Sequence, residues 1–96
     1  MSETQQLPQI FVIVLNWNGK EDTLECLESV CCIEYPAYSV VVVDNGSVDD
    51  SVAAVRNRFP DVTVLETGSN LGYAGGNNVG IRYAMENGAD YATTSR

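Results

Sequence analysis

The chain has 96 residues, 45% of them hydrophobic, which is typical of one small domain with an ordinary core. Its formal net charge of −8 argues against nucleic-acid binding, which needs clustered Lys and Arg, and the absence of histidine removes the commonest transition-metal ligand. Residues 1–9, an expected N-terminal tail, have no signal-peptide pattern, and no run reaches the roughly 20 apolar residues of a membrane span, so a cytoplasmic location is predicted. The three cysteines lack metal-site spacing and are predicted to be buried apolar residues of a reduced protein: Cys26, Cys31 and Cys32.

The first two expected elements are a strand and a helix. Residues 10–15 form an unbroken apolar run rich in β-branched side chains, which is typical of a buried strand. A polar loop follows at residues 16–19. Residues 20–30 are predicted to be helical, because apolar side chains there recur at spacings of three and four.

A second strand is predicted over residues 39–43, which contain four consecutive valines. A run without polar alternation indicates a strand covered on both faces, as in a parallel sheet with helices on each side. Asp44 follows at the carboxyl end of this strand, where open α/β sheets bind their ligands. The alternative is that its carboxylate only caps its own turn. Ser47 through Asp50 has the form of a capping box for a second helix.

The remainder of the chain predicts a short third strand at residues 62–66 and a third helix that begins in the Gly- and Asn-rich segment 67–76. The order βαβαβα with short connections indicates a parallel sheet with right-handed crossovers. From residue 92 the chain supplies no apolar run, so a fourth strand is expected to be missing or degenerate. The stripe that unites the third helix is predicted to contain Ala74, Asn78, Ile81 and Met85.

Three polar loops follow the predicted strands, and the carboxyl ends of parallel strands meet at one edge, so a single binding cleft is expected there. A carboxylate in that cleft can accept from the imide N–H of a pyrimidine or from a ribose hydroxyl, and glycines let the backbone approach a ligand closely. The alternative is that the glycines only shape a loop. The candidate nucleotide-binding residues are Asn16, Asn18, Asp44, Asn45, Ser47, Gly72, Asn77 and Asn78.

Two familiar α/β classes do not fit this pattern. A dinucleotide-binding Rossmann domain needs G-x-G-x-x-G directly after the first strand, whereas residues 16–22 contain one glycine and two carboxylates that would repel pyrophosphate. A phosphoacceptor receiver domain needs an acidic pair after that strand, which is also missing.

Three motifs together resemble a known family. VIVLNWNG at residues 12–19, VVDNGS at 42–47 and NLGYAGGNNVG at 70–80 resemble the N-terminal, nucleotide-binding half of family 2 glycosyltransferases, and most closely the rhamnosyltransferase-like branch. The resemblance extends over residues 10–91. It implies a GT-A fold and an inverting transfer of sugar from a UDP- or dTDP-linked donor to a hydroxyl acceptor.

The same resemblance suggests roles for the candidate residues. Asp44 would accept a hydrogen bond from the pyrimidine base, and Asn16 with its neighbours would line the base and ribose site. The glycine-rich segment from Gly72 would close over the nucleoside, with Asn77 or Asn78 making a polar contact.

The chain departs from the family at its end. Family members carry an acidic D-x-D-like motif after the fourth strand that holds Mg²⁺ or Mn²⁺, and a later Asp or Glu serves as general base. Neither is found in this sequence, so no catalytic residue or metal ligand is assigned, and Asp49 and Asp50 are interpreted as helix caps. Residues 92–96 are expected to be a tail outside the family.

The prediction is therefore a donor-nucleotide-binding fragment that is inactive alone, with Mg or Mn required only by the full-length family. The alternatives are a stand-alone non-catalytic α/β module that binds a nucleotide or a partner, and a decayed gene product. Loss of a fourth strand would expose the edge of the strand at residues 10–15. Self-association through that edge, as a homodimer or domain-swapped oligomer, is expected to follow.

Overall fold

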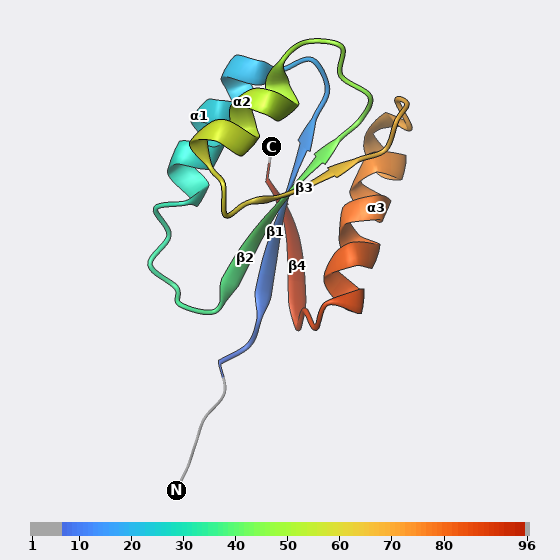
Figure 1. Cartoon of the computed structure of the whole chain (residues 1–96). Helices are drawn as coiled ribbons and strands as arrows, with labels where there is room; N and C mark the ends of the chain where they lie inside the picture. The colour runs from blue at the N-terminus through green and yellow to red at the C-terminus, as the bar shows by residue number, and fades with distance from the viewer. Residues whose placement is uncertain (1–6, 96) are drawn as a thin grey trace, which may run out of the picture.

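The computed structural model describes residues 7–95, which form an α/β fold with one sheet of four parallel strands in the order β3-β2-β1-β4. Helices α1 and α2 cover one face of the sheet and α3 covers the other (Figure 1). The predicted fold class is confirmed. The elements in chain order are β1 (Ile10–Asn16), α1 (Lys20–Val30), β2 (Tyr38–Asp44), α2 (Ser51–Arg58), β3 (Thr63–Glu66), α3 (Gly72–Glu86) and β4 (Tyr91–Ser95).

The valine run of β2 is buried on both faces, as its lack of polar alternation predicts. Val40 and Val42 pack in a cluster with α1 and α2, whereas Val41 and Val43 pack in a second cluster with α3. The adjacent strand β1 divides in the same way between the two clusters. Burial of these two central strands supplies most of the core, and it fixes the carboxyl ends of both strands at one level in the sheet.

The face of α3 that packs on the sheet differs from the predicted stripe. Its buried residues are small or polar, and a Cβ added to Gly80 would lie 2.6 Å from Cγ2 of Ile13. The helix therefore approaches the sheet too closely for long side chains, and the apolar spacing selects the wrong face. Of the predicted stripe, Ala74, Asn78 and Met85 are exposed and Ile81 is half-buried.

The fourth strand is present, and the expectation that it would be missing is wrong. Residues Tyr91–Ser95 pair in parallel with β1, from Ile10 opposite Tyr91 to Val14 opposite Ser95. The strand is degenerate only in composition, because its side chains are small or polar and mostly exposed. Tyr and Thr have high strand propensity, and the open side of β1 supplies the hydrogen-bonding partner. Most of the predicted tail at residues 92–96 thus belongs to the sheet.

The presence of β4 removes the basis for the predicted self-association. Strand β1 lies between β2 and β4, so residues 10–15 are not an exposed edge. The two edge strands are β3 and β4. Both are short, and short edge strands are poorer templates for intermolecular pairing than an apolar strand such as β1.

The cysteines are more exposed than predicted. Cys26 is half-buried, while Cys31 and Cys32 are exposed because α1 ends at Val30 and they lie in the following turn. Partial burial, together with the neighbouring thiols of Cys32 and Cys26, raises the pKa of the Cys31 thiol. All three are free thiols. Within residues 7–95, none of the helices has the length and apolar character needed to cross a bilayer.

Candidate functional site

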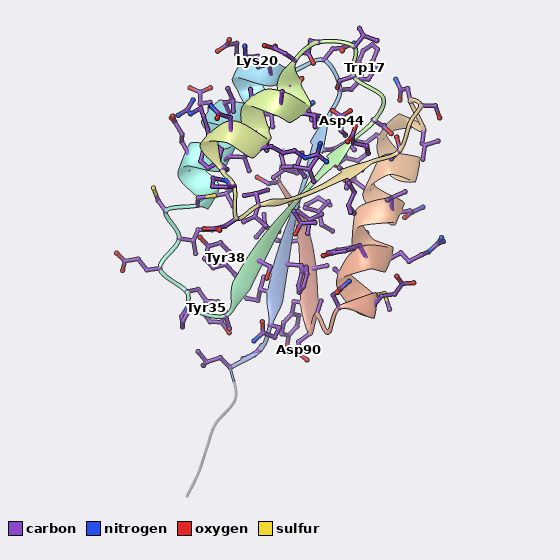
Figure 2. All side chains as sticks on the ribbon, in the orientation of Figure 1. Trp17, Lys20, Tyr35, Tyr38, Asp44 and Asp90 are labelled. Carbon is purple, nitrogen blue, oxygen red and sulfur yellow. The ribbon has the colours of Figure 1, made fainter. Side chains whose placement is uncertain are left out.

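The loops that follow β1, β2 and β3 meet at the carboxyl edge of the sheet, as the parallel topology predicts. Trp17, Lys20 and Asp44 lie at this end of the molecule (Figure 2). We call residues 16–19 the first loop, 45–50 the second loop and 67–71 the third loop. Side-chain hydrogen bonds join the first loop to the second, and the second to the third, so the three loops form one connected site.

Asp44 is the anchor of the second loop. Asp44 is 3% exposed, and its Oδ1 accepts hydrogen bonds from Nδ2 of Asn16 at 2.7 Å and from the hydroxyl of Ser47 at 2.7 Å. Its Oδ2 accepts from the backbone N–H of Ser47 at 3.0 Å. The carboxylate therefore caps its own turn and also holds the end of β1. These three bonds leave one acceptor position unused among the four of an ionised carboxylate.

Asn16 connects Asp44 to helix α1. Its side chain is 1% exposed, and its Oδ1 accepts from the hydroxyl of Thr23 at 2.6 Å. Its Nδ2 donates to Asp44 and, at 3.1 Å, to the hydroxyl of Ser47. Both ends of this amide are engaged inside the protein, so Asn16 lies beneath the predicted nucleotide site rather than on its surface.

Asn18 clamps the first loop to the second. Its backbone N–H donates to the hydroxyl of Ser47 at 2.8 Å, and its Oδ1 accepts from the backbone N–H of Val48 at 2.8 Å and of Asp49 at 3.3 Å. Asn18 has a φ of 50°, a left-handed conformation that asparagine tolerates better than most residues. A salt bridge of 3.1 Å between Lys20 and Asp50 adds a contact between the start of α1 and the second loop.

The predicted capping box does not form. Helix α2 begins at Ser51, and the Ser47 hydroxyl bonds to Asp44, Asn16 and Asn18 instead of a helical N–H. At the start of the helix, the carboxylate of Asp49 accepts hydrogen bonds from the backbone N–H of Ser51 at 3.1 Å and from the hydroxyl of Ser51. The hydrogen bond from this hydroxyl lowers the pKa of Asp49.

Asn45 joins the second loop to the third. Asn45 is 2% exposed, and its Nδ2 donates two hydrogen bonds while its Oδ1 accepts one from a backbone N–H. The hydroxyl of Thr67 also lies within hydrogen-bonding distance of Oδ1, although its nearest acceptor is the carbonyl of Ser69 at 2.6 Å. The backbones of the second and third loops also lie close together here, because a Cβ added to Gly46 would lie 2.9 Å from Cα of Ser69. The three bonds of the Asn45 amide run to Oδ1 of Asn70 (3.2 Å), the carbonyl of Gly72 (3.0 Å) and the N–H of Leu71 (3.1 Å).

The remaining candidate residues, Gly72, Asn77 and Asn78, lie on α3 and differ in their surroundings. Gly72 has a φ of 79°, and a Cβ there would meet no atom within 4 Å, so the start of α3 is open to solvent. Asn77 is buried against the sheet. Asn78 is exposed and lines a hollow formed by α3 alone, together with Ile81 and Met85. The structure therefore brings Gly72 to the connected loops and places Asn78 on the outer face of the helix.

Several large apolar side chains at this edge escaped the sequence analysis. Trp17 is 55% exposed on the first loop and Val48 is 90% exposed on the second, while Leu71 and Tyr73 are exposed beside the third. A lone tryptophan inside a polar loop after a strand is a signal that could have revealed Trp17. Thr23 was also missed, and its spacing from Asn16 carries no recognisable motif.

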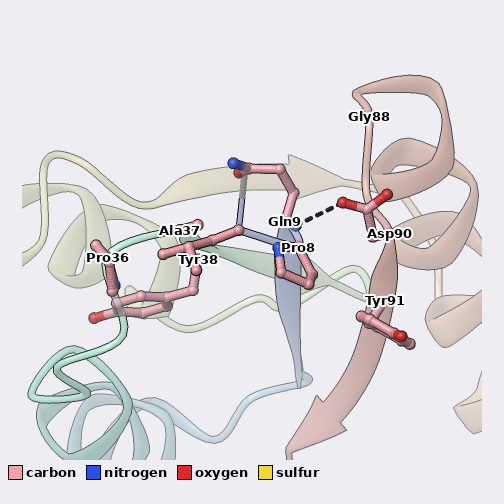
Figure 3. Close-up of a pocket in the computed structure, with 9 residues that line it drawn as sticks. Pro8, Gln9, Pro36, Ala37, Tyr38, Gly88, Asp90 and Tyr91 are labelled. Atoms are coloured by element: carbon pink, nitrogen blue, oxygen red, sulfur yellow. Dashed lines mark hydrogen bonds between the residues drawn. The ribbon is translucent and has the colours of Figure 1, made fainter. Parts of the chain in front are cut away.

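Another hollow lies at the opposite edge of the sheet (Figure 3). It has a volume of about 960 Å³ and is lined by residues at the amino ends of β1, β2 and β4, including Gln9 before β1, Tyr38 at the start of β2 and Tyr91 at the start of β4. The backbone N–H of Gln9 donates to Asp90 at 2.7 Å across it. Ligands of parallel sheets bind at the carboxyl ends of the strands, so the three loops remain the stronger site.

The described residues do not provide a metal centre. Across residues 7–95, no group of three or more Cys, Asp or Glu side chains could hold a metal ion. The carboxylate of Asp44, the most buried acid of the site, is engaged by protein donors.

Residues 11–92 match the model of glycosyl transferase family 2. The chain belongs to glycosyl transferase family 2. The structure of a mannosyltransferase from Pyrobaculum calidifontis, in complex with GDP-Man and Mn²⁺, is similar to this chain with a TM-score of 0.73 and 33% identity, over 80% of this chain and 24% of that one. The predicted GT-A-type half-domain is thereby confirmed.

Two relatives of this family 2 chain are similar to it over different shares of its length. The low-salt glycan biosynthesis hexosyltransferase Agl10 of Haloferax volcanii is 31% identical over 80 residues, 83% of this chain and 24% of the relative. An N-acetylglucosaminyl-diphospho-decaprenol L-rhamnosyltransferase of Mycobacterium tuberculosis is 51% identical over 35 residues, 36% of this chain and 11% of the relative. The chain thus spans at most about a quarter of the length of these proteins.

Proposed function

We propose that this chain is the donor-nucleotide-binding part of an inverting glycosyltransferase that takes its sugar from a UDP- or dTDP-linked donor and passes it to a hydroxyl acceptor. The connected site at the carboxyl edge of the sheet, in a chain that belongs to family 2, carries this proposal. The nucleotide-sugar complex of the Pyrobaculum mannosyltransferase supports a nucleotide sugar as the kind of ligand.

The nucleoside would be held by polar recognition and by stacking. Asp44 Oδ2 has one acceptor position left, and the imide N–H of uracil or thymine is a suitable donor for it. The exposed ring of Trp17 is available to stack on the base, a contact typically worth about 1–3 kcal/mol. Gly72 offers a backbone that a ribose or phosphate could approach closely.

The diphosphate would find little support on this chain. Carboxylates and a divalent cation offset the charge of a leaving diphosphate in family 2 enzymes, and residues 7–95 contain no such metal-binding group. The hollow beside the first loop is lined by three acids, Glu21, Asp22 and Asp49, and by one cation, Lys20, which is paired with Asp50. The excess of negative charge there would repel phosphate. We therefore expect the isolated chain to bind the nucleoside portion weakly and to lack transfer activity without a metal site and a general base.

Calorimetric titration with UDP, dTDP and GDP, each with and without Mn²⁺, tests this function. The expected result is weak binding of UDP or dTDP that does not depend on Mn²⁺ and is lost in Asp44→Ala. Asp61→Ala, an exposed acid near the amino end of β3, is the matched control and should bind as the wild type does. Preference for GDP would contradict the pyrimidine assignment, and equal affinity in Asp44→Ala would remove Asp44 from the site.

A cytoplasmic location completes the proposal. Cys31 and Cys32 are exposed free thiols, and such thiols persist in reducing compartments. Cell fractionation that places the protein outside the cytoplasm would contradict this assignment.

A further inference from the structure

A buried chain of hydrogen bonds runs from helix α1 to the second loop. The hydroxyl of Thr23 donates to Oδ1 of Asn16 at 2.6 Å, and Nδ2 of the same amide donates to Oδ1 of Asp44 at 2.7 Å. Thr23 is 0% exposed and Asn16 1%, so both are sealed from solvent, and Asp44, which is 3% exposed, is the member of the chain that reaches the surface of the site. Thr23 lies in the first turn of α1, outside the three family motifs.

The order of donors and acceptors along this chain allows one orientation of the Asn16 amide. The carboxylate of Asp44 can only accept when ionised, so it must face the NH₂ group, and the Asn16 oxygen must then face Thr23. The Thr23 hydroxyl satisfies that oxygen. Without the hydroxyl, a buried acceptor would lose its partner, and the amide would lose the contact that fixes it from the helix side.

We propose that Thr23 is a positioning residue, which acts through Asn16 to orient the Asp44 carboxylate and to hold the first loop against the second. Its connection to nucleotide affinity rests on the proposed function. Asn16 acts in the same way, and its predicted role of lining the base is replaced by a role beneath the site. The group that would touch the base remains Asp44.

The consequence should be visible at Trp17. This residue lies between Asn16, which Thr23 orients, and Asn18, which bonds to Ser47 and Val48 in the second loop. It is the only tryptophan of the chain, so its fluorescence reports on the first loop without interference. If the hydroxyl of Thr23 is removed, we expect the first loop to loosen and Trp17 to become more accessible to solvent.

The test compares Thr23→Val, which removes the hydroxyl at nearly constant volume, with Thr23→Ser, which keeps the hydroxyl and removes only the methyl group. Acrylamide quenching of Trp17 in the ligand-free protein should increase in Thr23→Val and return toward the wild-type value in Thr23→Ser. The affinity for UDP should fall about tenfold in Thr23→Val, the effect of losing one hydrogen bond between the Asp44 carboxylate and the base, and should stay near the wild-type value in Thr23→Ser.

Two controls separate positioning from stability. Thr63→Val makes the same chemical change at the start of β3, away from the loops, and should leave quenching unchanged. Val55→Ala removes core contacts under α2, so it lowers stability without touching the hydrogen-bond chain. Equal quenching in Thr23→Val and wild type, or an equal increase in Val55→Ala, would overturn the proposal. If wild type binds neither UDP nor dTDP, the proposed function fails, while the quenching comparison still decides the role of Thr23.

Discussion

At the scale of single residues, the site is built from polar side chains that bind one another. Asp44 and Asn45 stand side by side at the end of β2, yet each serves a different neighbour. Asp44 bonds back to the end of β1 and to its own turn, whereas Asn45 bonds forward to the third loop. These hydrogen bonds therefore fix the relative positions of the three loops in the ligand-free protein.

Asn45→Ala should be among the most damaging single changes in the site. It removes three hydrogen bonds to Asn70, Gly72 and Leu71 and leaves their groups unsatisfied, for which we expect a loss of about 2–3 kcal/mol in the free energy of unfolding. Urea denaturation measures this loss. Asn57→Ala, at an exposed position of α2, is the matched control, and a similar effect of both changes would contradict the role given to Asn45.

The start of α2 provides a pH-dependent prediction. Hydrogen bonding from Ser51 holds the pKa of Asp49 below its ordinary value, so the charged form stabilises the folded state at pH values above that ordinary value. This contribution is lost as the pH falls through the lowered pKa. In Ser51→Ala, NMR titration of the Asp49 carboxyl should give a pKa closer to the ordinary value, and an unchanged pKa would contradict the assignment.

At the scale of elements, the close approach of α3 to the sheet explains both a prediction error and a vulnerability. Periodicity of apolar side chains indicates a helix but not which face it presents, and here the glycines decide the face. The strand β4 escaped sequence analysis for a related reason. Its residues carry no apolar signal, and its formation depends on the free side of β1, which is distant in sequence.

Gly80→Ala tests the packing of α3. The added methyl would lie 2.6 Å from Cγ2 of Ile13 and 3.0 Å from Cγ2 of Val43, both in the centre of the sheet. Overpacking should exceed the gain in helix propensity, and we expect a net loss of about 1–2 kcal/mol in stability. Thermal denaturation, with Asn78→Ala on the exposed face of the same helix as control, measures this difference. A stabilised Gly80→Ala protein would show that the helix can move away without cost.

At the scale of the whole molecule, the fold class and the meeting of the three loops at one edge of the sheet followed from local patterns. The valine run indicated a doubly covered strand, and the three loops indicated one edge, because both depend only on neighbouring residues and on parallel topology. The internal geometry of the site did not follow. Whether Asp44 and Asn16 face a ligand or each other depends on contacts between segments about thirty residues apart, such as the pair joined at 2.7 Å.

Binding of nucleotide at the carboxyl edge of the sheet can be observed by NMR titration of the ¹⁵N-labelled chain with UDP. We expect chemical-shift changes at the Trp17 indole and in the backbone amides of Asn18, Ser47 and Gly72, with none at Tyr38 or Tyr91 in the opposite hollow. Shift changes confined to that hollow, or none at saturating UDP, would contradict this expectation.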